Sequence, residues 1–197
     1  MLNIVIFGAP GSGKGTQSEQ LIEKYGLKHI STGDVLRDEI KNQTKLGKIA
    51  DMHISKGQLV PDELIIDMLA GILDAEKSGT GVIFDGFPRT IAQGKALNKI
   101  LKERNTGLSL VVNLNVEEDE LIQRLLNRGK VSGRSDDNLE TITARLKVYN
   151  EQTSPLIDFY EQEEKLLTVS GGGRSVLEIF EEIDQSVSKV HKKAVAC

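Results

Sequence analysis

The chain has 197 residues and a formal net charge of −4, with 27% charged and 39% hydrophobic residues. This composition suits a globular domain, and the acidic balance excludes a general attraction to nucleic acid or anionic membranes. Because the single cysteine is Cys197 and no apolar run suits a membrane span or a secretion signal, we expect no internal disulfide, no cysteine zinc cluster and a cytoplasmic location.

Short apolar runs alternate with longer amphipathic stretches along the chain. The runs are continuous rather than alternating, which is typical of a parallel sheet covered on both faces. They predict strands at 2–7, in a segment ending at Ile30, at 81–85, at 108–116 and at 165–170. Helical patterns predict helices at 14–25, 34–42, 62–77, 90–103, 117–128, 138–162 and 175–190. This order predicts a doubly wound α/β fold in one domain, 1–197.

Two segments do not fit the simple alternation, namely 31–60 and "RGKVSGRSDD" at 128–137. In open α/β sheets, ligands bind at the carboxyl edge of the strands. We therefore expect both segments to be insertions over that edge. The core would then comprise 1–30, 61–127 and 138–197.

The first predicted strand is followed at once by the loop "GAPGSGKGT". A strand, a glycine-rich loop and a helix start form a phosphate cradle, because backbone N–H groups and the helix N-terminus attract anions. Gly8, Gly13 and Lys14 match the pattern G-x-x-x-x-G-K-[ST], but Gly15 stands at the Ser/Thr position and Thr16 follows it. We expect Lys14 to reach the phosphates of a nucleotide, whereas a direct contact of Thr16 with Mg²⁺ is left open. The alternative is an ordinary glycine turn.

Six of the eight arginines lie in short motifs or at the edges of the two insertions, and lysine supplies most of the other positive charge. The planar guanidinium group is always charged and suits bidentate phosphate binding, so this segregation indicates a polyphosphate site. For any single arginine, a solvated or ion-paired surface position explains the residue equally well. The six are Arg37, Arg89, Arg124, Arg128, Arg134 and Arg145.

Asp85 ends the third predicted strand, in "DGFPRT". A carboxylate at the end of a strand beside a phosphate loop is placed to hold Mg²⁺ through waters. The alternative is an Asp that initiates the turn.

We interpret Asp136 and Asp137 first as lid or helix-cap residues, because "DNLE" from Asp137 resembles a capping box, and only second as nucleotide ligands.

The remaining polar and aromatic candidates give weaker signals. The histidines show no metal-ligand spacing, so we interpret His29 and the other two as surface or packing residues. Tyr149, Phe159 and Tyr160 fall at helical spacing and are interpreted as core residues.

An ordered set of motifs that covers nearly the whole chain resembles the nucleoside monophosphate kinases, specifically the adenylate kinases. The motifs are "GAPGSGKGTQ", "STGDVLR", "KGQLVP", "DGFPRT", "RLLNRG", "SGRSDD" and "ARLKVY". The resemblance implies a P-loop fold with a five-stranded parallel sheet, an AMP-binding insertion at 31–60 and a short lid at 128–137 that lacks a zinc site. It also implies a monomer.

The reaction that the resemblance implies is Mg²⁺-dependent phosphoryl transfer from ATP to AMP, giving two ADP, which serves adenine nucleotide homeostasis. The acceptor is a phosphate oxygen that is already anionic, so the reaction needs no general base. Catalysis then consists of positioning two anions and neutralising charge in the transition state. Closure of the two insertions would keep water out.

The resemblance also implies roles for individual residues. The implied catalytic residues are Lys14, Arg89, Arg128, Arg134 and Arg145. The implied ATP-binding residues are Gly11, Ser12, Gly13, Lys14, Gly15, Thr16, Arg124 and Arg128. The implied AMP-binding residues are Thr32, Arg37, Gln58, Val60, Gly86, Arg89, Gln93, Arg134 and Arg145, and the implied magnesium residue is Asp85.

Three alternatives compete with this interpretation. A UMP/CMP kinase of the same family tends to carry Ala at the position of Thr32 and Asn at that of Gln93, so this chain has the adenylate pair. A nucleotide switch would need the guanine signature N-K-x-D, and the nearest string, "NKIL", lacks the Asp. A non-catalytic ATP-binding protein would have no use for Arg37 and Arg89.

Overall fold

The computed structural model describes residues 1–76, 79–132, 134 and 136–195. Gly133 and Ser135, which belong to the expected lid, and Cys197 lie outside the described residues. None of the helices in the described ranges is long and apolar enough to cross a membrane.

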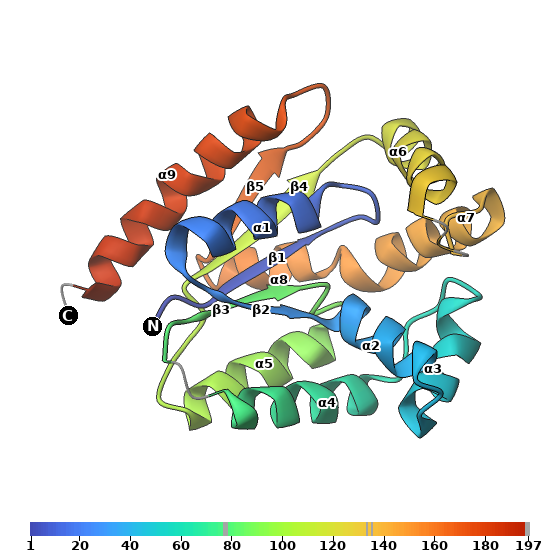
Figure 1. The fold of residues 1–197 in the computed structure, drawn as a ribbon. Helices are drawn as coiled ribbons and strands as arrows, with labels where there is room; N and C mark the ends of the chain where they lie inside the picture. The colour runs from blue at the N-terminus through green and yellow to red at the C-terminus, as the bar shows by residue number, and fades with distance from the viewer. Residues whose placement is uncertain (77–78, 133, 135, 196–197) are drawn as a thin grey trace.

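Within the described residues, five parallel strands form a sheet in the order β2–β3–β1–β4–β5 (Figure 1). The predicted doubly wound α/β fold is therefore confirmed, and each predicted strand is present with ends within two residues of the prediction. The strands are β1 (Ile4–Gly8), β2 (Lys28–Ser31), β3 (Val82–Asp85), β4 (Leu110–Asn115) and β5 (Leu166–Ser170).

Helices connect these strands and surround the sheet. They are α1 (Lys14–Tyr25), α2 (Thr32–Lys41), α3 (Lys45–Ile54), α4 (Asp62–Ala75), α5 (Ile91–Glu103), α6 (Glu118–Ser132), α7 (Leu139–Val148), the π-helical turn η1 (Tyr149–Thr153), α8 (Leu156–Gln162) and α9 (Val176–Val195).

The central strand shows why both faces of the sheet are covered. Successive side chains of a strand point to opposite faces, and every residue of β1 is buried. Ile4 and Ile6 pack in the cluster formed with α1 and α9. Val5 and Phe7 pack in the cluster formed with α4, α5 and α8. The continuous apolar run thus serves two cores at once.

Three features differ from the helices that the sequence predicts. Helix α3, inside the 31–60 segment, is not predicted at all. Helix α6 continues to Ser132, so the first part of the expected lid is helical. The single helix predicted at 138–162 is instead α7, η1 and α8, and Pro155 stands directly before α8. Pro155 lacks the N–H that an uninterrupted helix would use.

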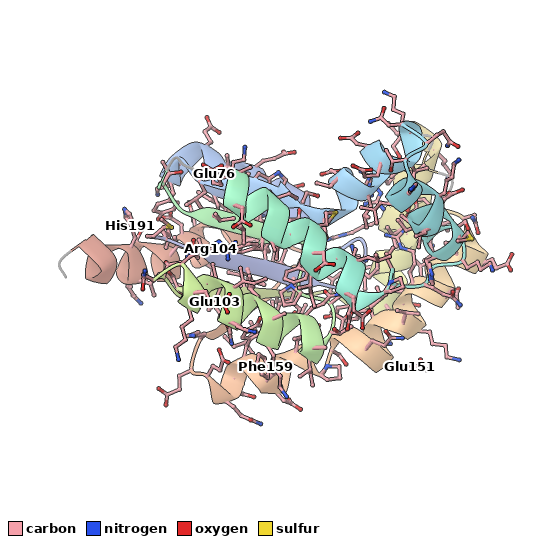
Figure 2. The ribbon with its side chains drawn as sticks, turned by 90° about the horizontal axis from the view of Figure 1, so that it is seen from below. Glu76, Glu103, Arg104, Glu151, Phe159 and His191 are labelled. Atoms are coloured by element: carbon pink, nitrogen blue, oxygen red, sulfur yellow. The ribbon has the colours of Figure 1, made fainter. Side chains whose placement is uncertain are left out.

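The segments that interrupt the simple alternation lie together in space. Helices α2 and α3, the C-terminal end of α6 and the N-terminal end of α7 stand at the carboxyl end of the strands, on the right in Figure 1. On the side seen in Figure 2, α4 and α5 run side by side beneath the sheet, and α2 and α3 lie beyond one of their ends.

Candidate active site

The loop after β1 has a backbone that only glycine accommodates at its first position. Gly8 has φ +147°, and a Cβ there would lie 2.5 Å from the carbonyl oxygen of Leu114 in β4. The loop ends at Gly13, the N-cap of α1, which has φ +95° and makes no side-chain capping bond. The first N–H groups of α1 therefore have no side-chain cap, which suits them to bind an anion.

Lys14 is the first residue of α1 and folds back over this loop. Its Nζ donates to the carbonyl oxygens of Gly8 at 2.9 Å and Ala9 at 3.0 Å. Burial lowers the pKa of Lys14 to about 8; Asp85 opposes this shift, and Arg89 and other nearby arginines add to it. The ammonium group is thus crowded by positive charge, and a bound polyanion would relieve that crowding.

A cavity of about 480 Å³ opens in front of the loop. The six arginines that the sequence singles out all line it: Arg37, Arg89, Arg124, Arg128, Arg134 and Arg145. They come from α2, the loop after β3, α6, the segment after α6, and α7. Arg104 and Arg174 lie elsewhere, in ion pairs with Asp74 and Glu182. Figure 2 shows Arg104 at the end of α5 that is far from α2 and α3.

Most other residues predicted for the site line the same cavity. These are Gly11, Gly13, Lys14, Gly15, Thr16, Thr32, Gln58, Val60, Asp85, Gly86 and Gln93. Ser12 is the exception, since its side chain is buried behind the loop beside Gly8 and does not line the cavity.

The adjacent carboxylates of Asp136 and Asp137 hold two of the arginines in place. Arg128 makes a bidentate pair with Asp137, at 2.7 and 2.8 Å. Arg145 donates to Asp136 at 2.7 Å and to Asp137 at 3.1 Å. Burial opposes the ionisation of Asp137, yet the hydrogen bond from Arg128 and the surrounding arginines lower its pKa. The prediction of Asp137 as a helix cap is wrong, because Asn138 is the N-cap of α7 and accepts from Thr141 N.

The loop after β3 places Arg89 beside the α2 segment. Arg89 Nε donates to the Gly86 carbonyl oxygen at 2.8 Å, and the Thr32 hydroxyl donates to the same oxygen at 2.9 Å. Burial lowers the pKa of Arg89 to about 10, and the nearby Arg145 contributes. The guanidinium group stays charged near neutral pH. Arg37, on α2, forms an ion pair with Asp34.

The family described as adenylate kinase matches residues 6–165 of this chain. The chain belongs to the adenylate kinase family. Three relatives named adenylate kinase illustrate the similarity: that of Parabacteroides distasonis is 65% identical, and that of Bacteroides thetaiotaomicron is 61% identical, each over 96% of this chain and 100% of the relative. That of Porphyromonas gingivalis is 54% identical over 98% of both chains.

Membership of the adenylate kinase family makes this chain a nucleoside monophosphate kinase, that is, a phosphotransferase. The relatives also decide between the alternatives, since they carry the adenylate name rather than that of a pyrimidine kinase or a nucleotide switch.

His29 and Tyr149 are among the residues that line this cavity although the sequence analysis does not assign them to the site. His29 lines the cavity, and its Nε2 is 3.7 Å from the Asp85 carboxylate, which raises the pKa of His29. The pairing of β2 with β3 brings the two together, which no spacing in the sequence reveals. Tyr149 lines the cavity as well, whereas Tyr160 is a core residue as predicted.

Proposed function

We propose that this cavity catalyses the reversible reaction Mg·ATP + AMP ⇌ 2 ADP. The observation that supports it is the convergence of six arginines, the glycine-rich loop and Asp85 on one cavity, although the chain is acidic overall. Phosphoryl transfer between two nucleotides brings together more negative charge than a single nucleotide carries. A cavity built to neutralise that charge fits the reaction.

ATP is assigned to the loop side of the cavity. The N–H groups of the loop and of the first turn of α1 would bind its phosphates together with Lys14. Arg124 and Arg128 lie four residues apart on α6, hence on one face. Arg124 now donates to Glu120 at 2.5 Å and to the Gly171 carbonyl oxygen at 2.8 Å. It is assigned to stack on the ATP base, and Arg128 to bind the phosphates.

AMP is assigned to the side formed by α2, α3 and the loop after β3. Arg37 and Arg89 would bind its phosphate, and Arg134 and Arg145 would bridge the group in transfer. Thr32, Gln58, Val60, Gly86 and Gln93 would form the base pocket. Charge-assisted, bidentate bonds from guanidinium groups suit phosphate oxygens and would hold donor and acceptor in line.

The residues at the cavity fit a magnesium ion. Mg²⁺ is bound by one or two carboxylates together with waters and substrate phosphates. The Asp85 carboxylate lines the cavity at the end of β3, next to β1 and its phosphate loop. Asp85 would hold the ion through waters. The bound ion would neutralise charge on the phosphates.

The 31–60 segment and the 128–137 segment are proposed to be an AMP-binding insertion and a short lid on one core domain. Both contribute arginines to the cavity, Arg37 from the first segment and Arg128 and Arg134 from the second. Their closure would exclude water from the reacting phosphates.

We propose that the protein works as a monomer in the cytoplasm. Gel filtration at micromolar protein concentration tests whether it is a monomer.

Replacement of Arg89 by Ala tests the acceptor side. We expect kcat/KM for AMP to fall by about a hundredfold or more, since a charge-assisted contact to the reacting phosphate is lost. The affinity for ATP, measured by titration calorimetry, should change by no more than about threefold, because Arg89 is assigned to the acceptor phosphate and not to ATP.

The matched control is Arg104→Ala, which removes an arginine side chain that lies outside the cavity, at the far end of α5. It should leave turnover unchanged. If Arg89→Ala turned over AMP as fast as the unaltered protein, the acceptor site would lie elsewhere. A coupled assay of ADP formation with AMP, UMP, CMP and GMP, with and without Mg²⁺, then defines the acceptor base and the need for the metal.

A further inference from the structure

Gln93 is a buried polar side chain at the wall of the cavity. Its exposed fraction is 2%, and it lies in the first turn of α5. Such a side chain must find hydrogen-bond partners within the protein or in a ligand. The structure shows which protein partners it has, and they determine how its amide group is turned.

Both atoms of the Gln93 amide already make one hydrogen bond. Oε1 accepts from the backbone N–H of Arg89 at 2.8 Å. Nε2 donates to Oδ1 of Asp62 at 2.7 Å. A carboxylate only accepts and a backbone N–H only donates, so the amide can be placed in one orientation only. Turning it over would set a donor against a donor and an acceptor against an acceptor.

Asp62 is the first residue of α4 and reaches across to the start of α5. Its second oxygen, Oδ2, accepts from the hydroxyl of Thr90 at 2.8 Å. Thr90 is itself the N-cap of α5 and accepts from Gln93 N. Asp62 does not line the cavity. It therefore acts on a ligand only through Gln93 and the turn that carries it.

The orientation of the amide leaves one N–H and one lone pair unused by these contacts. Position 6 of adenine carries an amino group, which donates, and the adjacent ring atom N1 accepts. In a 6-oxo purine both are reversed, because the oxygen at position 6 accepts and N1 carries a hydrogen that donates. A glutamine able to turn over would serve both kinds of base, whereas a fixed one serves the first and opposes the second.

We infer that Asp62 is a positioning residue for acceptor selectivity: its carboxylate fixes the amide of Gln93 so that the site takes a 6-amino purine and rejects a 6-oxo purine. The inference rests on the proposed function in one respect, namely that Gln93 contacts the acceptor base. Asp62 contributes the stronger of the two fixing contacts, because its hydrogen bond is charge-assisted.

AMP and IMP are the probes, since they differ at position 6 and at N1 only. The measured quantity is the ratio of kcat/KM for AMP to that for IMP. In Asp62→Ala we expect this ratio to fall about tenfold, which corresponds to the loss of one hydrogen bond. The change should come from KM, while kcat at saturating AMP stays within about threefold.

Two companion variants separate fixing of the amide from support of the fold. Asp62→Asn keeps an oxygen for Gln93 and an NH₂ group for Thr90, so it should retain most of the selectivity. Glu63→Ala removes an exposed carboxylate from the same helical turn and should leave the ratio unchanged. Thermal unfolding of each variant shows whether the fold is intact.

The decisive comparison is the double variant Asp62→Ala/Gln93→Leu. If Asp62 acts through Gln93, the ratio in the double variant equals that in Gln93→Leu alone. An unchanged ratio in Asp62→Ala beside a collapsed ratio in Gln93→Leu would overturn the inference and leave the proposed function standing. An equal loss of kcat with both nucleotides would also overturn it, since Asp62 would then only support Arg89. If the unaltered protein failed to use AMP, the proposed function itself would fail.

Discussion

Lys14 titrates within reach of ordinary assay conditions because its surroundings oppose its charge. Burial lowers its pKa to about 8 in the ligand-free protein, with contributions from neighbouring arginines. The protonated form is the one that attracts phosphate. As the pH rises through about 8, that form is lost and the site weakens. Bound phosphates favour the ammonium group, so the pKa of Lys14 should be higher in the loaded enzyme.

The pH profiles of two kinetic constants test whether Lys14 loses its proton near pH 8 in the free enzyme and at a higher pH in the loaded enzyme. The constant kcat/KM for ATP reports the free enzyme, and we expect it to fall above about pH 8 by up to tenfold per unit. The constant kcat reports the loaded enzyme and should stay level to a higher pH. Lys14→Arg carries a permanent charge, so its weaker activity should show no such fall. A level kcat/KM from pH 7.5 to 9.5 in the unaltered protein would contradict the assignment.

At the scale of single residues, the sequence indicates the groups that we propose bind phosphate better than the groups that position them. Glycines, Lys14 and the arginines are recognisable because their side-chain chemistry suits anions wherever they occur. The contacts of Asp62 with Gln93 and of His29 with Asp85 arise only through packing of distant segments. An acid in the first turn of a helix, such as Asp62, is already explained by the helix dipole, so the local pattern gives no reason to look further.

Among the elements, the packing of α2 on α3 depends on one side chain being absent. Gly47 is buried in α3, and a Cβ there would overlap the carbonyl group of Glu39 in α2. Gly47→Ala must therefore push the two helices apart. We expect unfolding free energy to fall by about 1–3 kcal/mol and KM for AMP to rise, because Arg37 lies on α2.

Gly71→Ala is the matched control for that substitution. Gly71 lies on the exposed side of α4, and a Cβ there meets nothing within 4 Å. The same chemical change should raise stability by up to about 1 kcal/mol through helix propensity. Thermal and urea unfolding measure both variants. Equal effects of the two substitutions would show that α2 and α3 adjust freely to the added methyl group.

The same glycine explains why α3 is absent from the sequence-based prediction. Strands are predicted because their apolar runs are short and rich in β-branched residues, which distinguishes them from a buried helix. Helix α3 contains Gly47, which weakens a helical pattern, and the reason for Gly47 is a contact with another helix. The break at η1 has a local cause in Pro155, but its position also depends on packing, since Thr153 in that turn donates to the Arg89 carbonyl oxygen at 2.8 Å.

On the scale of the whole molecule, the site assembles from segments far apart in the chain. A compound that joins two adenosines through a polyphosphate should fill both sides of the cavity. At a hundred times its Kd it should raise the unfolding free energy by about 2.7 kcal/mol. It should also draw the 31–60 and 128–137 segments together.

Fluorescent labels can measure that movement. Met52 on α3 and Val131 near the end of α6 are both exposed, so cysteines at these positions accept labels without disturbing the core. Cys197 is replaced by Ser in the labelled chain. We expect energy transfer to increase when the compound binds. Stabilisation with unchanged transfer would mean that the two segments do not close.

The place of β1 in the sheet has a consequence for how the protein is made on the ribosome. It is synthesised before β3 and β4, the two strands that flank it. Asn3, just ahead of it, is fully buried, and its side chain bonds to the Val82 backbone and to Thr106 and Gly107. The phosphate loop thus leaves the exit tunnel long before the partners that shape it. Nascent chains that end before β4 should have no ATP-binding capacity, and a chaperone would meet the most apolar strand while it is still unpaired.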